Sequence, residues 1–316
     1  MKTSPPTPGA PAPGEVVEVG APAPPARPAP PEPLEGDPSA SPLPGWPWWS
    51  ALVVLLGAFV LTAIGAIVVD LPAVAFGAEI TSSHTPPGLT IADTFVQDLA
   101  FVAAPLLCAH WLTRAVRPWQ FGLRRPGVGW GAAALMVVGL IVAFLALNAV
   151  WSLLVNPGKE KLLEQLGTKE STLLLVLSAG LTCVVAPMCE EFLFRGYIFT
   201  ALRSWGLVPA AIADGLLFGG VHVSSAPALD LLPLAALGFG LCLLYRYSGS
   251  LYPGMGAHSL NNCLAFASLA HWSWLGGLAL IAASLAGVTT VIWTCKRVGL
   301  IVPGRRVEAG LAGPAA

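Results

Sequence analysis

The feature that most constrains this chain is a series of long apolar runs that begins after residue 45. A helix that crosses a bilayer needs about 20 consecutive, mostly apolar residues. Eight runs come close to this length, and they predict spans at residues 50–69, 92–112, 130–154, 172–199, 207–224, 228–246, 251–271 and 274–295. Charge is scarce as well, because only 10% of the residues are Asp, Glu, Lys or Arg, against about 25% in soluble proteins. The sequence therefore predicts an all-α fold, a polytopic membrane bundle of about eight transmembrane helices.

The two ends of the chain differ from this bundle in composition. Residues 1–45 contain 15 of the 30 prolines and no long apolar run. Such a segment cannot bury enough apolar surface to offset the entropy lost on ordering. We expect a disordered Pro/Ala-rich tail at 1–45, a helical domain at 46–298 that carries the function, and a short flexible tail at 299–316. The net charge of −1 gives no support to a nucleic-acid partner.

The lysines and arginines outside the spans predict the orientation in the membrane. With the N-terminus in the cytoplasm, twelve of them face the cytoplasm and three, all within 159–169, face outward. Cytoplasmic loops are the ones enriched in these residues, so both termini are expected there, in an integral multi-pass protein of the plasma (inner) membrane. The segment 159–170 carries Leu162, Leu163 and Leu166 on one helical face, which predicts that it lies on the bilayer surface.

The fourth predicted span contains three charged residues within six positions: Glu190, Glu191 and Arg195. Charged groups inside a bilayer are costly, which makes them functional candidates by default. Glu191 and Arg195 are four residues apart, so they share a helical face and can pair. Glu190 is rotated by about 100° from Glu191. The pattern predicts that Glu191 and Arg195 support a site and that Glu190 is free to act in it.

Two histidines lie within later apolar runs. His222 follows Phe218 by four residues in the fifth span, and His258 precedes Asn262 by four in the seventh. Glu190 lies sixteen residues before Gly206, where the chain turns, and His222 lies sixteen after it. At 1.5 Å per residue both side chains sit about 24 Å along antiparallel helices. We therefore expect Glu190 and His222 to meet across the bundle.

These side chains suit the hydrolysis of a peptide bond. That reaction needs a base to activate water and donors to stabilise the tetrahedral oxyanion. Glu190 can serve as the base with His222 as its partner, and His258 and Asn262 can donate to the oxyanion. The set Glu190, His222 and His258 is also a zinc-ligand set, so a zinc cofactor remains an alternative, although no HExxH motif is present.

A proton-coupled transporter or channel is the alternative function, because intramembrane acids and histidines also form proton relays. Transporters often contain internal repeats, and the motifs of this chain show none. A further acid in the fifth span, Asp214, could tune the site, line a water path, or pair with Arg203 or Arg246 at the cytoplasmic end. Its low position in the span favours the pairing at the cytoplasmic end.

The ordered motifs resemble the CPBP family, which comprises CAAX proteases and bacteriocin-processing enzymes (the Abi family) and includes the type II CAAX prenyl endopeptidases. The resemblance covers about residues 115–270. Its segments are FGLRRP at 121–126, PMCEEFLFRG at 187–196, FGGVH at 218–222 and GSLYPGMGAHSLNN at 249–262.

The resemblance implies an eight-helix intramembrane endopeptidase, by a glutamic or a metal-dependent mechanism, with a peptide or protein substrate at the membrane. By motif position, Glu190 is implied to activate water, with His222 as its partner. His258 and Asn262 are implied to stabilise the oxyanion, and Glu191 and Arg195 to support the site. Members of this family process prenylated proteins, bacteriocin precursors or other membrane-anchored peptides, and the sequence does not choose among these substrates or give an oligomeric state.

Overall fold

The computed structural model describes residues 44–81, 85–114, 116–155, 166, 168 and 171–299, and this part of the chain is helical without a β-strand. The predicted tails and the predicted surface segment 159–170 lie outside the described residues, apart from a few positions. The α-helices are α1 (Ser50–Ala75), α2 (Pro87–Thr113), α3 (Gly129–Leu154), α5 (Thr172–Gly180), α6 (Ala186–Glu191), α7 (Thr200–Leu202), α8 (Leu207–Gly220), α9 (Leu231–Ser248), α10 (Leu251–Leu269) and α11 (Trp274–Arg297).

Every predicted span corresponds to a helical segment, and the predicted fold class, a polytopic helical bundle, is confirmed. Six segments in the described part are long and apolar enough to cross a membrane: α1, α2, α3, the continuous stretch Thr172–Trp205, Ala228–Ser248 and α11. The predicted number of eight differs because of α8 and α10. Helix α8 has only 14 residues, and α10 has 19 but carries a histidine, two serines and two asparagines. These two helices contact other helices extensively, and Asp214 of α8 and His258 and Ser259 of α10 are buried by them.

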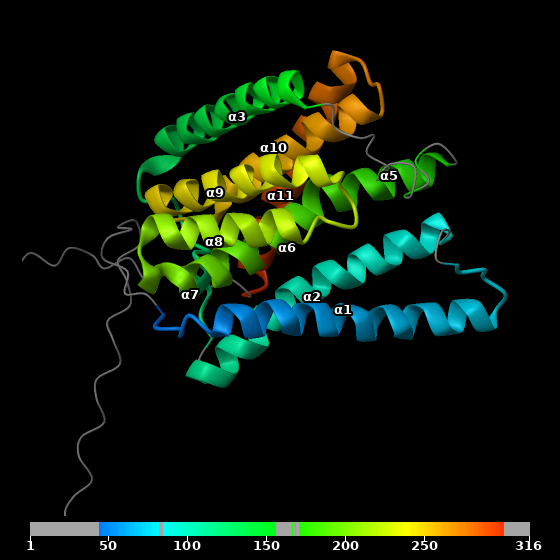
Figure 1. Cartoon of the computed structure of the whole chain (residues 1–316), viewed down its shortest axis with the longest axis horizontal. Coiled ribbons are helices and arrows are strands. Elements are labelled where there is room, and N and C mark those ends of the chain that lie inside the picture. The colour runs from blue at the N-terminus through cyan, green and yellow to red at the C-terminus, as the bar shows by residue number, and fades with distance from the viewer. Residues whose placement is uncertain are drawn as a thin grey trace, which may run out of the picture. The chain divides into compact units, whose positions relative to one another are not determined.

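The fourth span is the centre of the bundle. It runs through α5, the π-helical segment η2 (Leu181–Val185), α6, the π-helical segment η3 (Phe192–Phe199) and α7. All residues from Glu190 to Leu202 are buried. A helix that is buried on all sides requires neighbours all round. They are supplied by α1, α2, α8, α9 and α10, all of which contact this span (Figure 1).

Aromatic side chains fill the space around this central span. Trp46, which precedes α1, stacks on Tyr197 with ring centroids 4.2 Å apart. Phe121 stacks on Phe192 at 4.5 Å. These contacts join the N-terminal part of the described chain to η3, the segment that directly follows the two glutamates.

Helices α8 and α9 form the most closely packed pair. Their approach depends on small residues, as is common between membrane helices. A Cβ atom built on Gly215 would lie 2.6 Å from the backbone oxygen of Ala235, and one on Gly219 would lie 2.5 Å from that of Leu231. This pairing fixes the end of α8, where His222 follows, against the helix that contacts Arg195.

Candidate active site

The two adjacent glutamates have different surroundings, as the helical geometry predicts. Glu191 Oε1 lies 2.9 Å from Arg195 Nη1, and both side chains are fully buried. Glu190 has no such contact with Arg195 among the described residues, and its Oε2, like Oε2 of Glu191, has no hydrogen-bond partner there. The predicted pairing of Glu191 with Arg195 is therefore confirmed, and Glu190 is the carboxylate that remains.

Arg195 holds more than one partner. Its Nη2 donates to the backbone oxygen of Gly238 in α9 at 2.9 Å, and its guanidinium carbon lies 4.5 Å from the centre of the Phe218 ring. A buried guanidinium needs such hydrogen bonds and counter-charges to offset its desolvation. Arg195 thus ties the central span to both α8 and α9.

Asp214 is the second carboxylate on Arg195, and this corrects the expected partner. Asp214 Oδ2 lies 3.6 Å from Arg195 Nε, with both side chains fully buried, and it accepts from Cys242 Sγ at 3.0 Å. The expected partners were Arg203 or Arg246 at the cytoplasmic end. The expectation was wrong because position along α8 does not show which side chain on a neighbouring helix faces Asp214.

His258 of α10 is held by Glu191. Its Nδ1 lies 3.2 Å from Glu191 Oε1, and because a carboxylate accepts, Nδ1 carries the proton. The close approach of α10 requires Gly254, where a Cβ atom would lie only 2.7 Å from Glu191 Oε2. A carboxylate that accepts from one ring nitrogen fixes the ring orientation and leaves the other nitrogen for the site.

The remaining nitrogen of each histidine faces Glu190. Glu190 Oε2 lies 3.6 Å from His258 Nε2 and 4.0 Å from His222 Nε2. His222 follows the last turn of α8, where its Nδ1 lies 2.7 Å from the backbone oxygen of Phe218. Since that carbonyl only accepts, Nδ1 donates. With a proton on Nδ1, each ring presents Nε2 toward Glu190, where this nitrogen accepts a hydrogen bond unless it binds a second proton.

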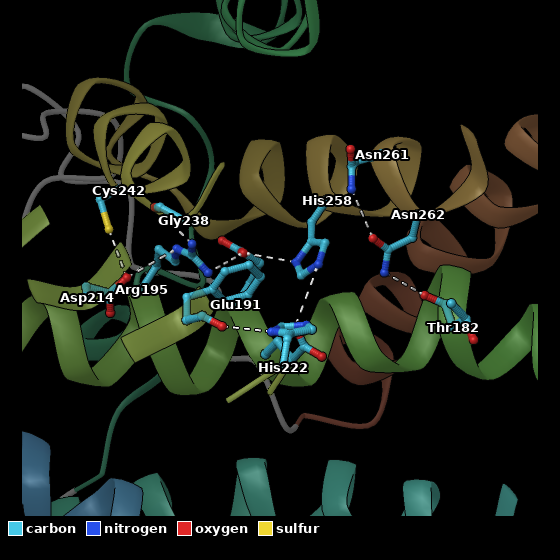
Figure 2. A network of polar contacts seen from close by, with 12 residues as sticks. Thr182, Glu191, Arg195, Asp214, His222, Gly238, Cys242, His258, Asn261 and Asn262 are labelled. Atoms are coloured by element: carbon cyan, nitrogen blue, oxygen red, sulfur yellow. Dashed lines mark hydrogen bonds and ion pairs between the residues drawn. The ribbon is translucent and has the colours of Figure 1, made fainter. Parts of the chain in front are cut away.

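The structure thus brings Glu190, His222 and His258 together, as the sequence predicts for Glu190 and His222 from their equal distance to the turn at Gly206. Helix α8 ends at Gly220, four residues before the predicted end of the span at 224, so His222 lies two residues beyond the helix and not inside it. Figure 2 shows the polar network that runs from Cys242 and Asp214 through Arg195 and Glu191 to His258.

Asn262 lies one helical turn beyond His258 and contacts the other end of the central span. Its Nδ2 donates to the backbone oxygen of Thr182 in η2 at 3.0 Å (Figure 2). Its Oδ1 accepts from Asn261 Nδ2 at 3.3 Å. One N–H of the Asn262 amide is thus committed to fixing α10 against η2, and one remains for a ligand.

A zinc ion is the cofactor alternative that the residue types allow. Zinc ligands lie about 2.0–2.2 Å from the metal, and a tetrahedron of that size places them about 3.4 Å apart. Glu190 Oε2 lies 3.6 and 4.0 Å from the two Nε2 atoms. Within the described residues, no group of three or more His, Cys, Asp or Glu is arranged to hold a metal ion. The residues as placed do not fit a metal, and no step below is derived through one.

One buried acid beside the site escaped the sequence reasoning. Asp98 of α2 is 1% exposed, and neither of its carboxyl oxygens has a hydrogen-bond partner within the described part of the chain. It lies close enough to Glu190 for the two to interact electrostatically. The signal was available, because Asp98 is an acid within the predicted span 92–112, as Glu190 is within the span at 172–199.

Comparison with known proteins bears on this arrangement. Residues 172–264 match the family model described as type II CAAX prenyl endopeptidase Rce1-like. The resemblance to the CAAX protease family is confirmed. The match to this family contains all six predicted site residues, namely Glu190, Glu191, Arg195, His222, His258 and Asn262. It is shorter than the expected 115–270, so FGLRRP at 121–126 and helices α1, α2, α3 and α11 lie outside it.

The match supports a CAAX-type intramembrane protease in general and gives no support to the transporter alternative. A protein of Mycoplasma capricolum subsp. capricolum, described as uncharacterized, is 31% identical over 137 residues, which is 40% of this chain. The aligned part is also 40% of that protein's length. No solved structure matches this chain.

Proposed function

We propose that this chain is an intramembrane endopeptidase that hydrolyses a peptide bond of a membrane-associated protein or peptide, with Glu190 as the base. The observation that supports this most is the position of Glu190 Oε2, which faces the Nε2 atoms of His222 and His258 and has no hydrogen-bond partner among the described residues. Oε1 of the neighbouring Glu191 already contacts Arg195 Nη1 and His258 Nδ1.

The proposed reaction begins with a water molecule placed between Glu190 and the histidines. Glu190 takes one proton from the water while the water oxygen bonds to the substrate carbonyl carbon. The π electrons of the carbonyl group move to the carbonyl oxygen, which becomes the oxyanion. His222 Nε2 accepts from the second hydrogen of the water, because the His222 Nδ1 proton is directed at Phe218. When the tetrahedral intermediate collapses, the C–N bond breaks and the amine leaves with the proton that Glu190 took.

The oxyanion is the proposed target of His258 and Asn262. Because the Nδ1 proton of His258 is directed at Glu191, Nε2 can donate only when the ring carries both protons. Asn262 donates with the N–H that does not contact Thr182. Donors aimed at developing negative charge supply a large share of the catalysis in such reactions.

The name of the matching family directs the choice of the first substrate. CAAX motifs are C-terminal sequences whose cysteine is prenylated. An internally quenched peptide that ends in a farnesylated CAAX sequence is therefore the probe, with the same peptide lacking the farnesyl group beside it. If the farnesylated peptide is not cleaved, other membrane-anchored peptides are tested as substrates.

The test uses the full-length chain, purified in detergent and reconstituted in vesicles. Replacing Glu190 by Gln keeps the shape of the side chain and removes the base, so cleavage should fall by about 10²- to 10⁴-fold. The matched control is Glu79→Gln, the same change at an exposed residue between α1 and α2, which should leave cleavage unchanged. Cleavage by Glu190→Gln at the wild-type rate would overturn the assignment of the base.

A second arm separates the remaining alternatives. Cleavage that persists in a strong chelator is expected for a glutamate base, whereas loss that zinc restores would favour the metal-dependent mechanism. Proton flux across the vesicles that depends on His222, without cleavage of any peptide, would favour the transporter.

A further inference from the structure

Pro187, in α6, interrupts the backbone hydrogen bonds of the central span, because its ring leaves no N–H to donate. In an α-helix this N–H would bond to the backbone oxygen four residues earlier, that of Cys183. In a π-helix it would bond to the oxygen five residues earlier, that of Thr182. The residue before it follows the π pattern, since the backbone N–H of Ala186 donates to the oxygen of Leu181. Neither Thr182 nor Cys183 can therefore receive a hydrogen bond from position 187.

Helix α10 donates a hydrogen bond to each of these two backbone oxygens. Ser259 Oγ lies 2.6 Å from the oxygen of Cys183, and both residues are completely buried. Asn262 Nδ2 lies 3.0 Å from the oxygen of Thr182 (Figure 2). A backbone carbonyl without a donor is costly in the interior of a membrane protein. The two side chains therefore hold α10 against η2 at the place where the proline removes a donor.

Ser259 lies between the two residues of α10 that the proposed reaction uses. His258 precedes it by one residue, and Asn262 follows it by three. His258 contacts the central span at Glu191 in α6, whereas Ser259 and Asn262 contact it in η2. The helix is thus joined to the central span by three neighbouring side chains, and the proposed reaction gives a role to only two of them.

The number of donors indicates what Ser259 adds. The amide of Asn262 has two N–H groups, and one of them is used at Thr182. Because the hydroxyl of Ser259 supplies Cys183, the central span does not require the second. We propose that Ser259 is a positioning residue, which together with Asn262 replaces the hydrogen bonds that Pro187 cannot make and leaves the second Asn262 N–H for the oxyanion. This inference rests on the proposed function, in which Asn262 stabilises that oxyanion.

The first experiment needs no substrate and uses Pro187→Ala, which restores a backbone N–H at position 187. Ser259→Ala in the full-length chain should lower the unfolding temperature in detergent, because the backbone oxygen of Cys183 loses its donor. In the Pro187→Ala background the same change should lower the unfolding temperature by clearly less, since the restored N–H can bond to that oxygen. Comparing the two backgrounds removes the effect of the proline change itself.

The matched control is Ser268→Ala, the same change at an exposed position of α10. It should alter the unfolding temperature little in either background. A loss of the same size for Ser259→Ala with and without Pro187→Ala, or no loss in either background, would show that Ser259 does not replace the bond missing at the proline. Either result would overturn the proposal.

The second experiment measures cleavage of the farnesylated peptide in vesicles. Ser259→Ala should lower kcat by about 10- to 100-fold through misplacement of a donor. KM should stay near the wild-type value, because the oxyanion forms only after the substrate is bound. Ser259→Ala added to Asn262→Ala should lower kcat little further, since the residue through which Ser259 acts is then absent. A purely structural effect would lower kcat by the same factor in both backgrounds.

The two experiments fail separately. If no peptide is cleaved and Ser259→Ala still costs less stability beside Pro187→Ala, the replacement of the missing hydrogen bond stands, and the endopeptidase proposal falls together with the oxyanion role. If Glu190→Gln and Asn262→Ala slow cleavage while Ser259→Ala does not, or slows it equally without Asn262, the role of Ser259 falls alone.

Discussion

Arg195 is the residue on which the buried charges of this site depend. Its guanidinium is fully buried and lies between Glu191 on its own span and Asp214 on α8. Glu191 in turn orients His258 through Nδ1. The charge of Arg195 therefore determines the position of a histidine that it does not contact.

Replacing Arg195 by Met should destabilise the protein strongly. Both Glu191 and Asp214 would keep their buried positions without a cation, and breaking a buried pair in this way costs about 3–5 kcal/mol. Thermal unfolding in detergent measures the loss. Arg203→Met is the control, because Arg203 is only partly buried at the end of the span and should cost much less. Equal unfolding temperatures for Arg195→Met and wild type would contradict the structural role.

At this scale the sequence predicts pairs within one helix better than pairs between helices. The partner of Glu191 follows from its spacing of four to Arg195, which helix geometry alone provides. The partner of Asp214 did not follow, because it depends on how α8 is rotated against the central span. Asp98 was missed for a different reason, since no partner residue or motif marks it in its own helix.

The elements that carry the site depart from regular, independent spans. Helix α8 ends at Gly220, and the His222 ring satisfies the backbone oxygen of Phe218, one of the carbonyls that a helix end leaves without a partner. The central span contains two π-helical segments around α6. Such segments are frequent at functional sites. Their apolar residues do not differ in pattern from those of an α-helix, so the sequence could not predict them.

The pairing of α8 with α9 should be sensitive to one added methyl group. Gly219→Ala would place Cβ against the backbone oxygen of Leu231, and overpacking of this kind costs about 1–3 kcal/mol. Gly220→Ala is the matched control on the next residue, where Cβ would meet no atom within 4 Å. It should be neutral or stabilising by up to about 1 kcal/mol, because alanine favours helix.

Thermal unfolding of both glycine variants checks this prediction, and cleavage of the farnesylated peptide provides a second measurement. Gly219→Ala should also lower cleavage, since His222 lies only three residues after Gly219 and two after the end of α8. Similar behaviour of the two variants would mean that the close approach of α8 and α9 does not position the site.

At the scale of the whole molecule, α8 and α10 determine how many helices cross the bilayer. Length and hydropathy identify six in the described chain, whereas the runs of the sequence predict eight. The difference lies in α8 and α10, which bear His222 and His258 between them. Their polar residues lower the hydropathy that a count relies on, and burial by neighbouring helices makes those residues tolerable inside the membrane.

Cysteine labelling distinguishes the two counts. Ser204 precedes α8 and Ser224 follows it, and both are exposed. If α8 crosses the membrane, Ser204→Cys and Ser224→Cys should react with an impermeant maleimide from opposite sides. The expected orientation, with both termini in the cytoplasm, places Ser204 inside and Ser224 outside.

In intact cells only Ser224→Cys should then be labelled, and opening the cells should expose Ser204→Cys. The unsubstituted chain, whose six cysteines are buried or partly buried, gives the background. Labelling of both positions from one side would show that α8 enters and leaves on the same face, so that His222 is reached by a re-entrant segment and not by a span.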